Sequence, residues 1–175
     1  MTPKNQPTPQ HSPHFIHPNA KLDPTVQIEP FAVIHEDVEI GEGSHIGSNV
    51  VIYGGVKIGK NTRIMPGTVI SSNAANLEFW RKPEVETGGL PKVRIGDGVH
   101  IDSSVSIHGG ITIGDGCWIG SNCTIYDGAR IGKNCKIFPS AVLSAIPQDL
   151  KFSGEKTTSP PTIFRSESFI FFLGE

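Results

Sequence analysis

Large aliphatic residues recur at every sixth position over most of the chain, with one change of phase. Gly often follows the aliphatic residue, and a small or β-branched residue lies four positions after it. An α-helix would bring its apolar stripe back every 3.6 residues, so this period excludes a helix and favours short strands joined by turns. Nineteen such hexads occur in two registers: Ile16, Leu22, Ile28, Ile34, Ile40, Ile46, Ile52, Ile58, Ile64 and Ile70, then Ile95, Ile101, Ile107, Ile113, Ile119, Ile125, Ile131, Ile137 and Leu143.

This pattern predicts an all-β fold, a parallel β-helix whose coils stack on one another. Side chains alternate along a strand, so the aliphatic residue and the small residue two places before it share the inner face. A large residue beside a small one fills a narrow core, and each coil needs its neighbours to bury that core. Cys117, Cys123 and Cys135 occupy the small inward position, where we expect compact hydrophobic groups rather than nucleophiles or disulfide partners.

The period also divides the chain into segments. Residues 1–15 are polar and rich in Pro, which predicts a disordered leader, and residues 16–146 carry the β-helix. Residues 76–94 interrupt the hexads and predict a loop insertion, which either lines a site or is a surface excursion. Residues 147–175 are expected to form a C-terminal extension that caps the open last coil.

The second half of the helix repeats the first. Residues 34–79 align without a gap on residues 107–152, with 22 identities in 46 positions. The hexad pattern explains the shared Ile and Gly residues, but it does not explain outward matches such as His35 with His108. The two halves are therefore interpreted as copies of one ancestral segment.

Charge and hydropathy exclude several classes of function. The formal net charge is -2 and the sequence pI is about 6.4, so no basic character indicates nucleic-acid binding. There is no apolar run of the roughly 18 residues that a membrane span needs. The N-terminal residues lack the apolar core of a secretory signal, so we expect a cytoplasmic location.

The hexads resemble those of the hexapeptide-repeat acyltransferases, which are homotrimers of single-stranded left-handed parallel β-helices. Segment 113–158 is more similar still to the N-terminal part of the acyl-carrier-protein:UDP-N-acetylglucosamine O-acyltransferases. The string Pro-Gln-Asp-Leu-Lys-Phe at 147–152 is its most specific feature. The resemblance implies transfer of a 3-hydroxyacyl group from acyl carrier protein to UDP-N-acetylglucosamine, a step of lipid A biosynthesis. It implies no bound cofactor, and this chain is too short to include the family's C-terminal helical domain.

The same resemblance suggests site residues. Gln148, Asp149 and Lys151 match the segment that contacts the nucleotide sugar; an amide and a carboxylate can bond sugar hydroxyls, and a Lys can meet phosphate. The stretch Ser-Ile-His-Gly-Gly at 106–110 resembles the family's Thr-Ile-His-Arg-Gly and makes His108 the candidate general base. The family's catalytic His-Ile-Ala-His-Asp stretch is not found here, and its place, near residues 124–127, holds no His.

Three other readings stay open at this point. An acetyl-CoA-dependent acetyltransferase of small molecules or sugars would use the loop at 76–94 and the Gly-rich stretch 107–120. The second is a catalytically inactive β-helix with a structural or partner-binding role, which includes a truncated or impaired enzyme. Zinc catalysis, as in the γ-class carbonic anhydrases, is the third. It requires closely spaced histidines, and the spacings here do not match that family, so no metal site is expected.

Overall fold

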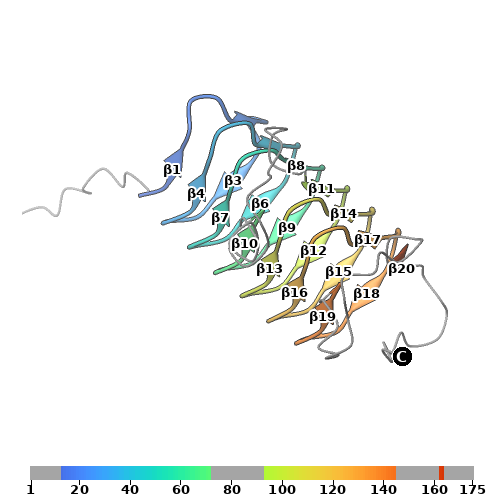
Figure 1. Cartoon of the computed structure of the whole chain (residues 1–175). Helices are drawn as coiled ribbons and strands as arrows, with labels where there is room; N and C mark the ends of the chain where they lie inside the picture. Colours follow the sequence, from blue (N-terminus) through green and yellow to red (C-terminus); the bar gives the residue numbers. More distant parts are fainter. Residues whose placement is uncertain (1–12, 72–92, 145–161, 164–175) are drawn as a thin grey trace, which may run out of the picture.

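The computed structural model describes residues 13–71, 93–144 and 162–163 of the 175-residue chain. Its short parallel strands form three sheets, which are the three walls of a left-handed β-helix (Figure 1). The predicted all-β, left-handed parallel β-helix of hexapeptide repeats is therefore confirmed. Each of the nineteen strands β1 to β19 ends at one of the nineteen predicted aliphatic residues.

The strands are distributed evenly over the walls. Sheet A contains β1 (Phe15–Ile16), β4 (Val33–Ile34), β7 (Val51–Ile52), β10 (Val69–Ile70), β13 (Ser106–Ile107), β16 (Thr124–Ile125) and β19 (Val142–Leu143). Sheet B contains β2 (Lys21–Leu22), β5 (Glu39–Ile40), β8 (Val56–Ile58), β11 (Val93–Ile95), β14 (Thr112–Ile113), β17 (Arg130–Ile131) and β20 (Thr162–Ile163). Sheet C contains β3 (Gln27–Ile28), β6 (His45–Ile46), β9 (Arg63–Ile64), β12 (His100–Ile101), β15 (Trp118–Ile119) and β18 (Lys136–Ile137).

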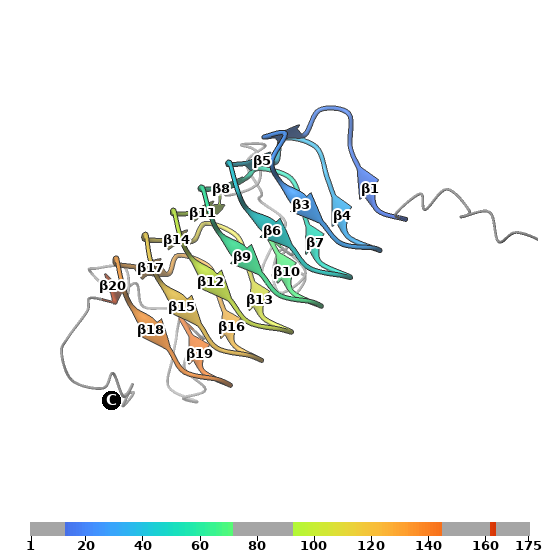
Figure 2. The ribbon, with the colours of Figure 1, turned by 180° about the vertical axis from the view of Figure 1, so that it is seen from behind.

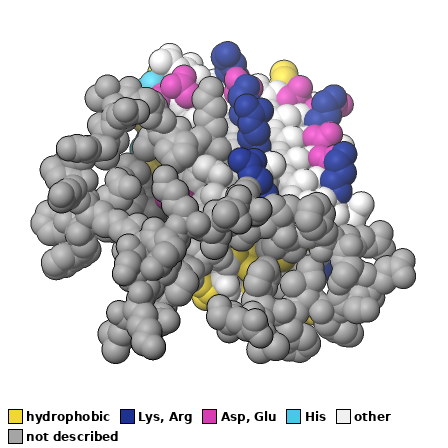
Figure 3. Space-filling model, turned by 45° about the vertical axis from the view of Figure 1, so that its right-hand side comes forward, with side chains coloured by type: hydrophobic (Ala, Val, Ile, Leu, Met, Phe, Trp, Pro, Cys, Tyr) yellow, Lys and Arg dark blue, Asp and Glu magenta, His cyan; other side chains and the backbone are white. Residues whose placement is uncertain are grey.

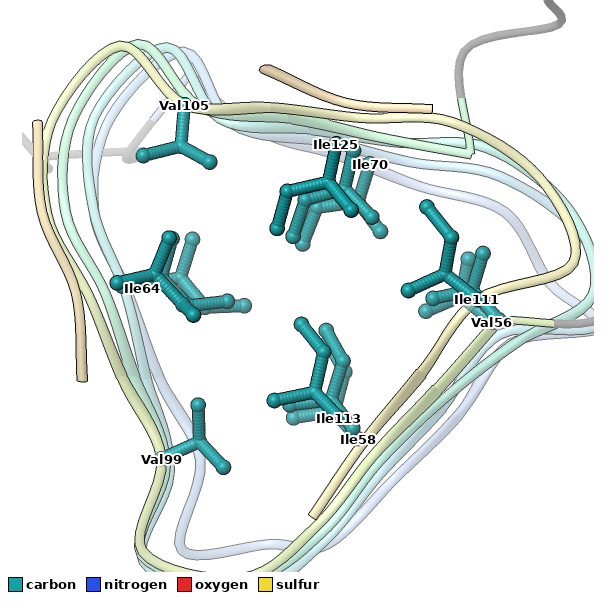
Figure 4. Close-up of a cluster of buried hydrophobic side chains, with 14 of the residues drawn as sticks. Val56, Ile58, Ile64, Ile70, Val99, Val105, Ile111, Ile113 and Ile125 are labelled. Carbon is teal, nitrogen blue, oxygen red and sulfur yellow. The ribbon is translucent and has the colours of Figure 1, made fainter. Parts of the chain in front are cut away.

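Each coil passes through sheets A, B and C in turn and stacks in register on the next coil. Ile34 pairs with Ile52, for example, and the Val33 amide donates to the Val50 carbonyl of the following coil at 2.8 Å. Figure 4 looks into the three-sided interior, where the aliphatic side chains of all three walls point toward one another. The inward isoleucines of the central coils are buried, and the small inward positions fill the corners. Periodic burial of one aliphatic residue per hexad therefore builds the core, as predicted.

The corners depend on residues that accept a left-handed backbone. Positive φ recurs at the third residue after the inward aliphatic, for instance at Asn49, Asn61, Asn122 and Asn134. Asn adopts this conformation more readily than most residues because its short polar side chain bonds locally. Gly takes the same position at other corners, for instance at Gly43 and Gly116, so Asn and Gly share these turns.

Two predicted boundaries differ from the structure. Phe15, which was assigned to the leader, pairs with Val33 as part of β1. Val93 and Arg94, which were assigned to the loop insertion, belong to β11, because Val93 fills the small inward position and is buried. The predicted C-terminal extension contains β20, which pairs with β17 as a further strand of sheet B. The rest of that extension lies outside the described residues.

The internal duplication follows the walls of the helix. The strands of the first copy, beginning with β4, correspond to those of the second copy, beginning with β13, and corresponding strands lie in the same sheet. Equivalent outward side chains of the two copies are therefore repeated on the same side of the molecule.

Candidate functional site

Three cationic or titratable side chains come together on the outer surface of sheet C. The residue before each inward isoleucine points outward, and pairing of β6, β9 and β12 aligns His45, Arg63 and His100 in a row. Neighbouring parallel strands lie about 4.8 Å apart, so the three side chains share one small surface. Figure 2 shows the strands of this sheet side by side. We call His45, Arg63 and His100, together with the carboxylates of Glu29 and Asp102, the histidine face.

Each histidine of this face is paired with a carboxylate. His100 Nε2 lies 2.9 Å from Asp102 Oδ1, and the two residues flank the inward Ile101 on one strand. His45 Nε2 lies 3.0 Å from Glu29 Oε1 of the preceding coil. A carboxylate at Nε2 favours the tautomer with its proton on that nitrogen, which leaves the Nδ1 lone pair free to accept a proton. This is the arrangement of a histidine oriented to act as a general base.

The carboxylates are themselves held in place. Glu29 Oε2 accepts hydrogen bonds from the Ser48 backbone amide at 2.9 Å and from the Ser48 hydroxyl at 2.6 Å. These bonds hold the pKa of the Glu29 carboxyl below its usual value, so Glu29 is ionised at neutral pH. The Asp102 backbone carbonyl accepts a hydrogen bond from the Thr68 hydroxyl at 3.1 Å, which ties its strand to the neighbouring coil.

Arg63 lies between the two histidine–carboxylate pairs. Its side chain is exposed, and it makes no ion pair within the described residues. A guanidinium carries its charge at every physiological pH and presents its donors in a planar fork. The histidine face therefore combines two oriented bases with a cation able to bind an anionic group or a developing oxyanion.

His108, the base predicted from the sequence, occupies a different position. It follows the inward Ile107 at the corner between sheets A and B, and its ring stacks on Tyr126 with ring centroids 4.7 Å apart. Its Nδ1 is buried and has no hydrogen-bond partner. A proton on Nδ1 would have no acceptor. The geometry therefore favours the tautomer that carries its proton on Nε2, and Nε2 is then the hydrogen-bond donor.

The duplication repeats this pair. His35 stacks on Tyr53 with centroids 4.9 Å apart, at the same corner. His35, His45, His100 and His108 each lie beside an inward aliphatic residue, and none of them belongs to the core. The structure pairs only His45 and His100 with a hydrogen-bonded carboxylate among these four. The catalytic assignment of His108 stays a prediction.

The substrate-binding candidates Gln148, Asp149 and Lys151 lie outside the described residues, so their prediction is also untested. Within the described residues there is no group of three or more His, Cys, Asp or Glu side chains that could hold a metal ion. The same part of the chain has no helix that is long and apolar enough to cross a membrane.

The three cysteines are buried in the small inward positions, as predicted. Burial raises the pKa of the Cys117 thiol to about 11 and also raises the pKa of Cys123. The Cys117 thiol donates to the Gly132 carbonyl at 2.9 Å, so it serves as a weak hydrogen-bond donor between coils. A protonated, buried thiol is a poor nucleophile, which agrees with the prediction that these cysteines act as compact hydrophobic groups.

Comparison with known proteins shows what this chain is similar to. The bacterial transferase hexapeptide (six repeats) model matches residues 37–72 and 110–145. These two ranges, 72 of the 175 residues, therefore hold hexapeptide repeats like those of bacterial transferases. The chain is 35% identical over 102 residues to the acyl-acyl-carrier-protein–UDP-N-acetylglucosamine O-acyltransferase of Saccharophagus degradans, a match that covers 55% of this chain and 37% of that protein. The chain thus corresponds to little more than a third of this relative's length.

Solved structures share the fold. A hexapeptide transferase family protein from Anaplasma phagocytophilum superposes with a TM-score of 0.55 at 20% identity, covering 71% of this chain and 66% of that one. The UDP-N-acetylglucosamine acyltransferase of Francisella novicida superposes with a TM-score of 0.54 at 22% identity, covering 76% of this chain and 62% of that one. At these identities the likeness establishes the β-helix and nothing finer.

The site candidates from the sequence did not include the histidine face, with its carboxylates Glu29 and Asp102 and its cation Arg63. The signal for Asp102 was present, because His100 and Asp102 flank an inward isoleucine and must share the outer surface. Glu29 could have been found from the coil length, since it lies one coil before Gly47 and so beside His45. The hexads are interrupted between β10 and β11, and the coils resume in register after the interruption. Arg63 and His100 are adjacent only for this reason.

Proposed function

We propose that this chain is the β-helical part of an acyltransferase that moves a 3-hydroxyacyl group from acyl carrier protein to UDP-N-acetylglucosamine. The identity to the Saccharophagus degradans enzyme supports this choice of donor and acceptor. The observation that carries the proposal is the His100–Asp102 pair at 2.9 Å, which lies one strand from Arg63 on an exposed wall. Ester formation by acyl transfer needs a base for the sugar hydroxyl and a cation or donor for the oxyanion.

In the proposed step, His100 Nδ1 takes the proton of the sugar hydroxyl while Asp102 holds the imidazole through Nε2. The hydroxyl oxygen forms a bond to the thioester carbonyl carbon, and the Arg63 guanidinium faces the negative charge that develops on the carbonyl oxygen. The carbon–sulfur bond then breaks. The proton passes from His100 to the departing thiolate of the carrier, so that His100 returns to its neutral form and no cofactor is consumed.

The test is an assay of the full chain with 3-hydroxyacyl carrier protein and UDP-N-acetylglucosamine, in which the acylated nucleotide sugar is measured. We expect His100→Gln to lower kcat by roughly 10²–10⁴-fold, the usual contribution of a general base. His108→Gln tests the base predicted from sequence. His35→Gln is its matched control, because His35 makes the same stack on a Tyr at the same corner.

The results separate the alternatives. Loss of activity in His108→Gln, with full activity in His100→Gln, would show that the general base is His108, at the corner between sheets A and B. Turnover with acetyl-CoA but not with the carrier protein would favour a small-molecule acetyltransferase. No turnover with either donor would favour a structural or partner-binding β-helix.

We further propose that the chain assembles as a homotrimer, as its resemblance to the hexapeptide-repeat family implies, and that Gln148, Asp149 and Lys151 bind the nucleotide sugar. The outward row of sheet A supports assembly, because it presents Val33 and Val51 as half-buried apolar side chains. Light scattering should give three times the 18.8 kDa of one chain. Asp149→Ala should raise KM for the nucleotide sugar more than it lowers kcat.

A further inference from the structure

Sheet C continues beyond the histidine face with an aromatic and a cationic side chain. β12 pairs with β15, and β15 pairs with β18, so Trp118 and Lys136 follow His100 in the outward row of this wall. Figure 2 shows β9, β12, β15 and β18 side by side. The proposed acyl-transfer step uses the histidine of this row and leaves Trp118 and Lys136 without a role.

The ring of Trp118 is held against a second aromatic ring. It meets Phe138 at an interplanar angle of 87°, with ring centroids 5.9 Å apart. In such a T-shaped contact the edge of one ring meets the face of the other, so Phe138 covers at most one face of the indole. Gly120 has no side chain between the two rings, and a Cβ there would come within 2.6 Å of the Pro139 nitrogen. Trp118 is only half-buried, so part of the indole faces solvent.

Lys136 carries a positive charge that the described residues do not balance. On the side of the molecule seen in Figure 3, Lys and Arg side chains stand among acidic ones, and Lys21 and Lys57 both approach Glu39. Lys136 is exposed and makes no ion pair with any residue that the structure describes. The outward row of sheet C, from Gln27 to Lys136, contains no carboxylate. Its lysine is therefore available to an anionic ligand.

The spacing of the row fits a sugar phosphate. Neighbouring parallel strands lie about 4.8 Å apart, so Trp118 lies about 5 Å from His100, and Lys136 lies about 10 Å from it. The C–H groups on one face of a pyranose ring can pack on the electron-rich face of an indole. A ring placed on Trp118 would present a hydroxyl to His100 on one side and a phosphate to Lys136 on the other, each within hydrogen-bonding reach.

The same spacing disfavours a nucleobase on Trp118. Bases stack on aromatic side chains, so the indole alone would accept one. In a nucleotide, however, the ribose separates the base from the phosphate, whereas Lys136 is on the strand directly beside Trp118. A base on Trp118 would also leave His100 without a hydroxyl to deprotonate.

We propose that Trp118 and Lys136 position the acceptor of the reaction, Trp118 as the platform for a hexose ring and Lys136 as the contact of the phosphate on its anomeric carbon. The proposal rests on the proposed function and adds a direction to it. The acceptor lies on the β15 and β18 side of His100, and the thioester lies on the side of Arg63. β18 is the terminal strand of sheet C, so no described strand of this sheet obstructs the rest of a nucleotide beyond Lys136.

The test measures binding without an acyl donor, so it does not depend on turnover. The chain contains two Trp residues, and Trp80→Phe leaves Trp118 as the only source of Trp fluorescence. The full chain with this substitution is titrated with N-acetylglucosamine 1-phosphate, with N-acetylglucosamine and with UMP. We expect the sugar phosphate to change the emission of Trp118 at the lowest concentration, the free sugar to do so at a higher one, and UMP to leave the emission unchanged.

Substitution of the lysine separates its contact from the stacking contact. In the same background, Lys136→Gln should raise Kd for the sugar phosphate about fivefold, as loss of one exposed charge contact would, and should leave Kd for the free sugar unchanged. Arg130→Gln removes an exposed cation at the equivalent outward position of sheet B and is the matched control, with no expected change.

Steady-state kinetics test the platform itself. Trp118→Ala should raise KM for UDP-N-acetylglucosamine about tenfold, which is more than it lowers kcat, because the lost contact holds the sugar rather than the reacting atoms. Trp118→Tyr should restore most of the loss, since an aromatic face is kept. If Trp118→Ala fails to fold, the Lys136→Gln titrations still decide the proposal.

Several results would overturn the proposal: no response of Trp118 to the sugar phosphate, an equal response to UMP, an unchanged Kd in Lys136→Gln, or equal weakening in Arg130→Gln. Acyl transfer without these responses would refute the positioning role alone. Binding of the sugar phosphate as expected, in a chain that transfers no acyl group, would refute the proposed reaction and not the binding site.

Discussion

The stacking of coils predicts that one substitution should have very different costs at two positions of the same row. Ile101 is fully buried and lies in sheet C between Ile64 and Ile119, one in each neighbouring coil. Ile28 belongs to the same row but is only partly buried, because β3 is the terminal strand of sheet C and pairs with β6 alone. Truncation to Ala therefore removes contacts on two sides at Ile101 and on one side at Ile28.

The magnitude follows from the atoms removed. Ile→Ala deletes three carbons, each worth about 0.8 kcal/mol of transfer free energy when buried, or about 2.4 kcal/mol. The cavity left in a narrow interior adds to this, so Ile101→Ala should lower the free energy of unfolding by about 3–5 kcal/mol. Ile28→Ala should cost about 1–2 kcal/mol, because much of its side chain is already in contact with water.

Urea denaturation followed by circular dichroism measures both free energies. All samples need the same protein concentration, since assembly would add concentration-dependent stability. The m-value shows whether the solenoid still unfolds as one unit after each substitution. An equal cost at the two positions would refute the view that each coil is stabilised by burial against its neighbours.

Two further predictions concern titratable groups. Because the cysteines are buried and burial raises the pKa of Cys117 to about 11, the thiols of the folded chain should not react with Ellman's reagent near pH 8. In the unfolded chain the reagent should detect all 3 thiols. Fast labelling of a thiol in the folded chain would contradict this prediction. The hydrogen bonds from Ser48 lower the folded pKa of Glu29, so its contribution to stability is present above the ordinary value of 4.5 and is lost as pH falls through the folded pKa. Glu29→Gln should therefore flatten the acid side of the stability curve below about pH 5, measured by urea unfolding, and an unchanged slope would show that Glu29 is not the group responsible.

The sequence predicted the fold more completely than the site because the two depend on different periods. A hexad repeats within a few residues, so Ile40, Ile46 and Ile52 already specify three successive walls. Contacts of the site follow the longer period of one full coil. That period predicts that His108 lies beside Tyr126, and it could have placed Glu29 beside His45.

The boundaries of the interruption were harder to predict. Val93 is buried in the small inward position, but a Val two residues after Pro91 gives no local sign that the coil has resumed before the next isoleucine. Arg94 was consequently assigned to a loop, although it pairs with Lys57 in sheet B.

The two copies are offset by nine strands, which make three whole coils, and this has a consequence for how such a molecule can change in length. Since β4 and β13 fall on the same wall, adding or removing one copy leaves every surviving side chain on its original side. Lengthening by such blocks keeps the aromatic corner of His35 and Tyr53 aligned with its duplicate at His108 and Tyr126. The helix can thus be lengthened by whole coils without changing the side on which any residue lies. The insertion of one or two further strands would instead move every later strand to a different sheet.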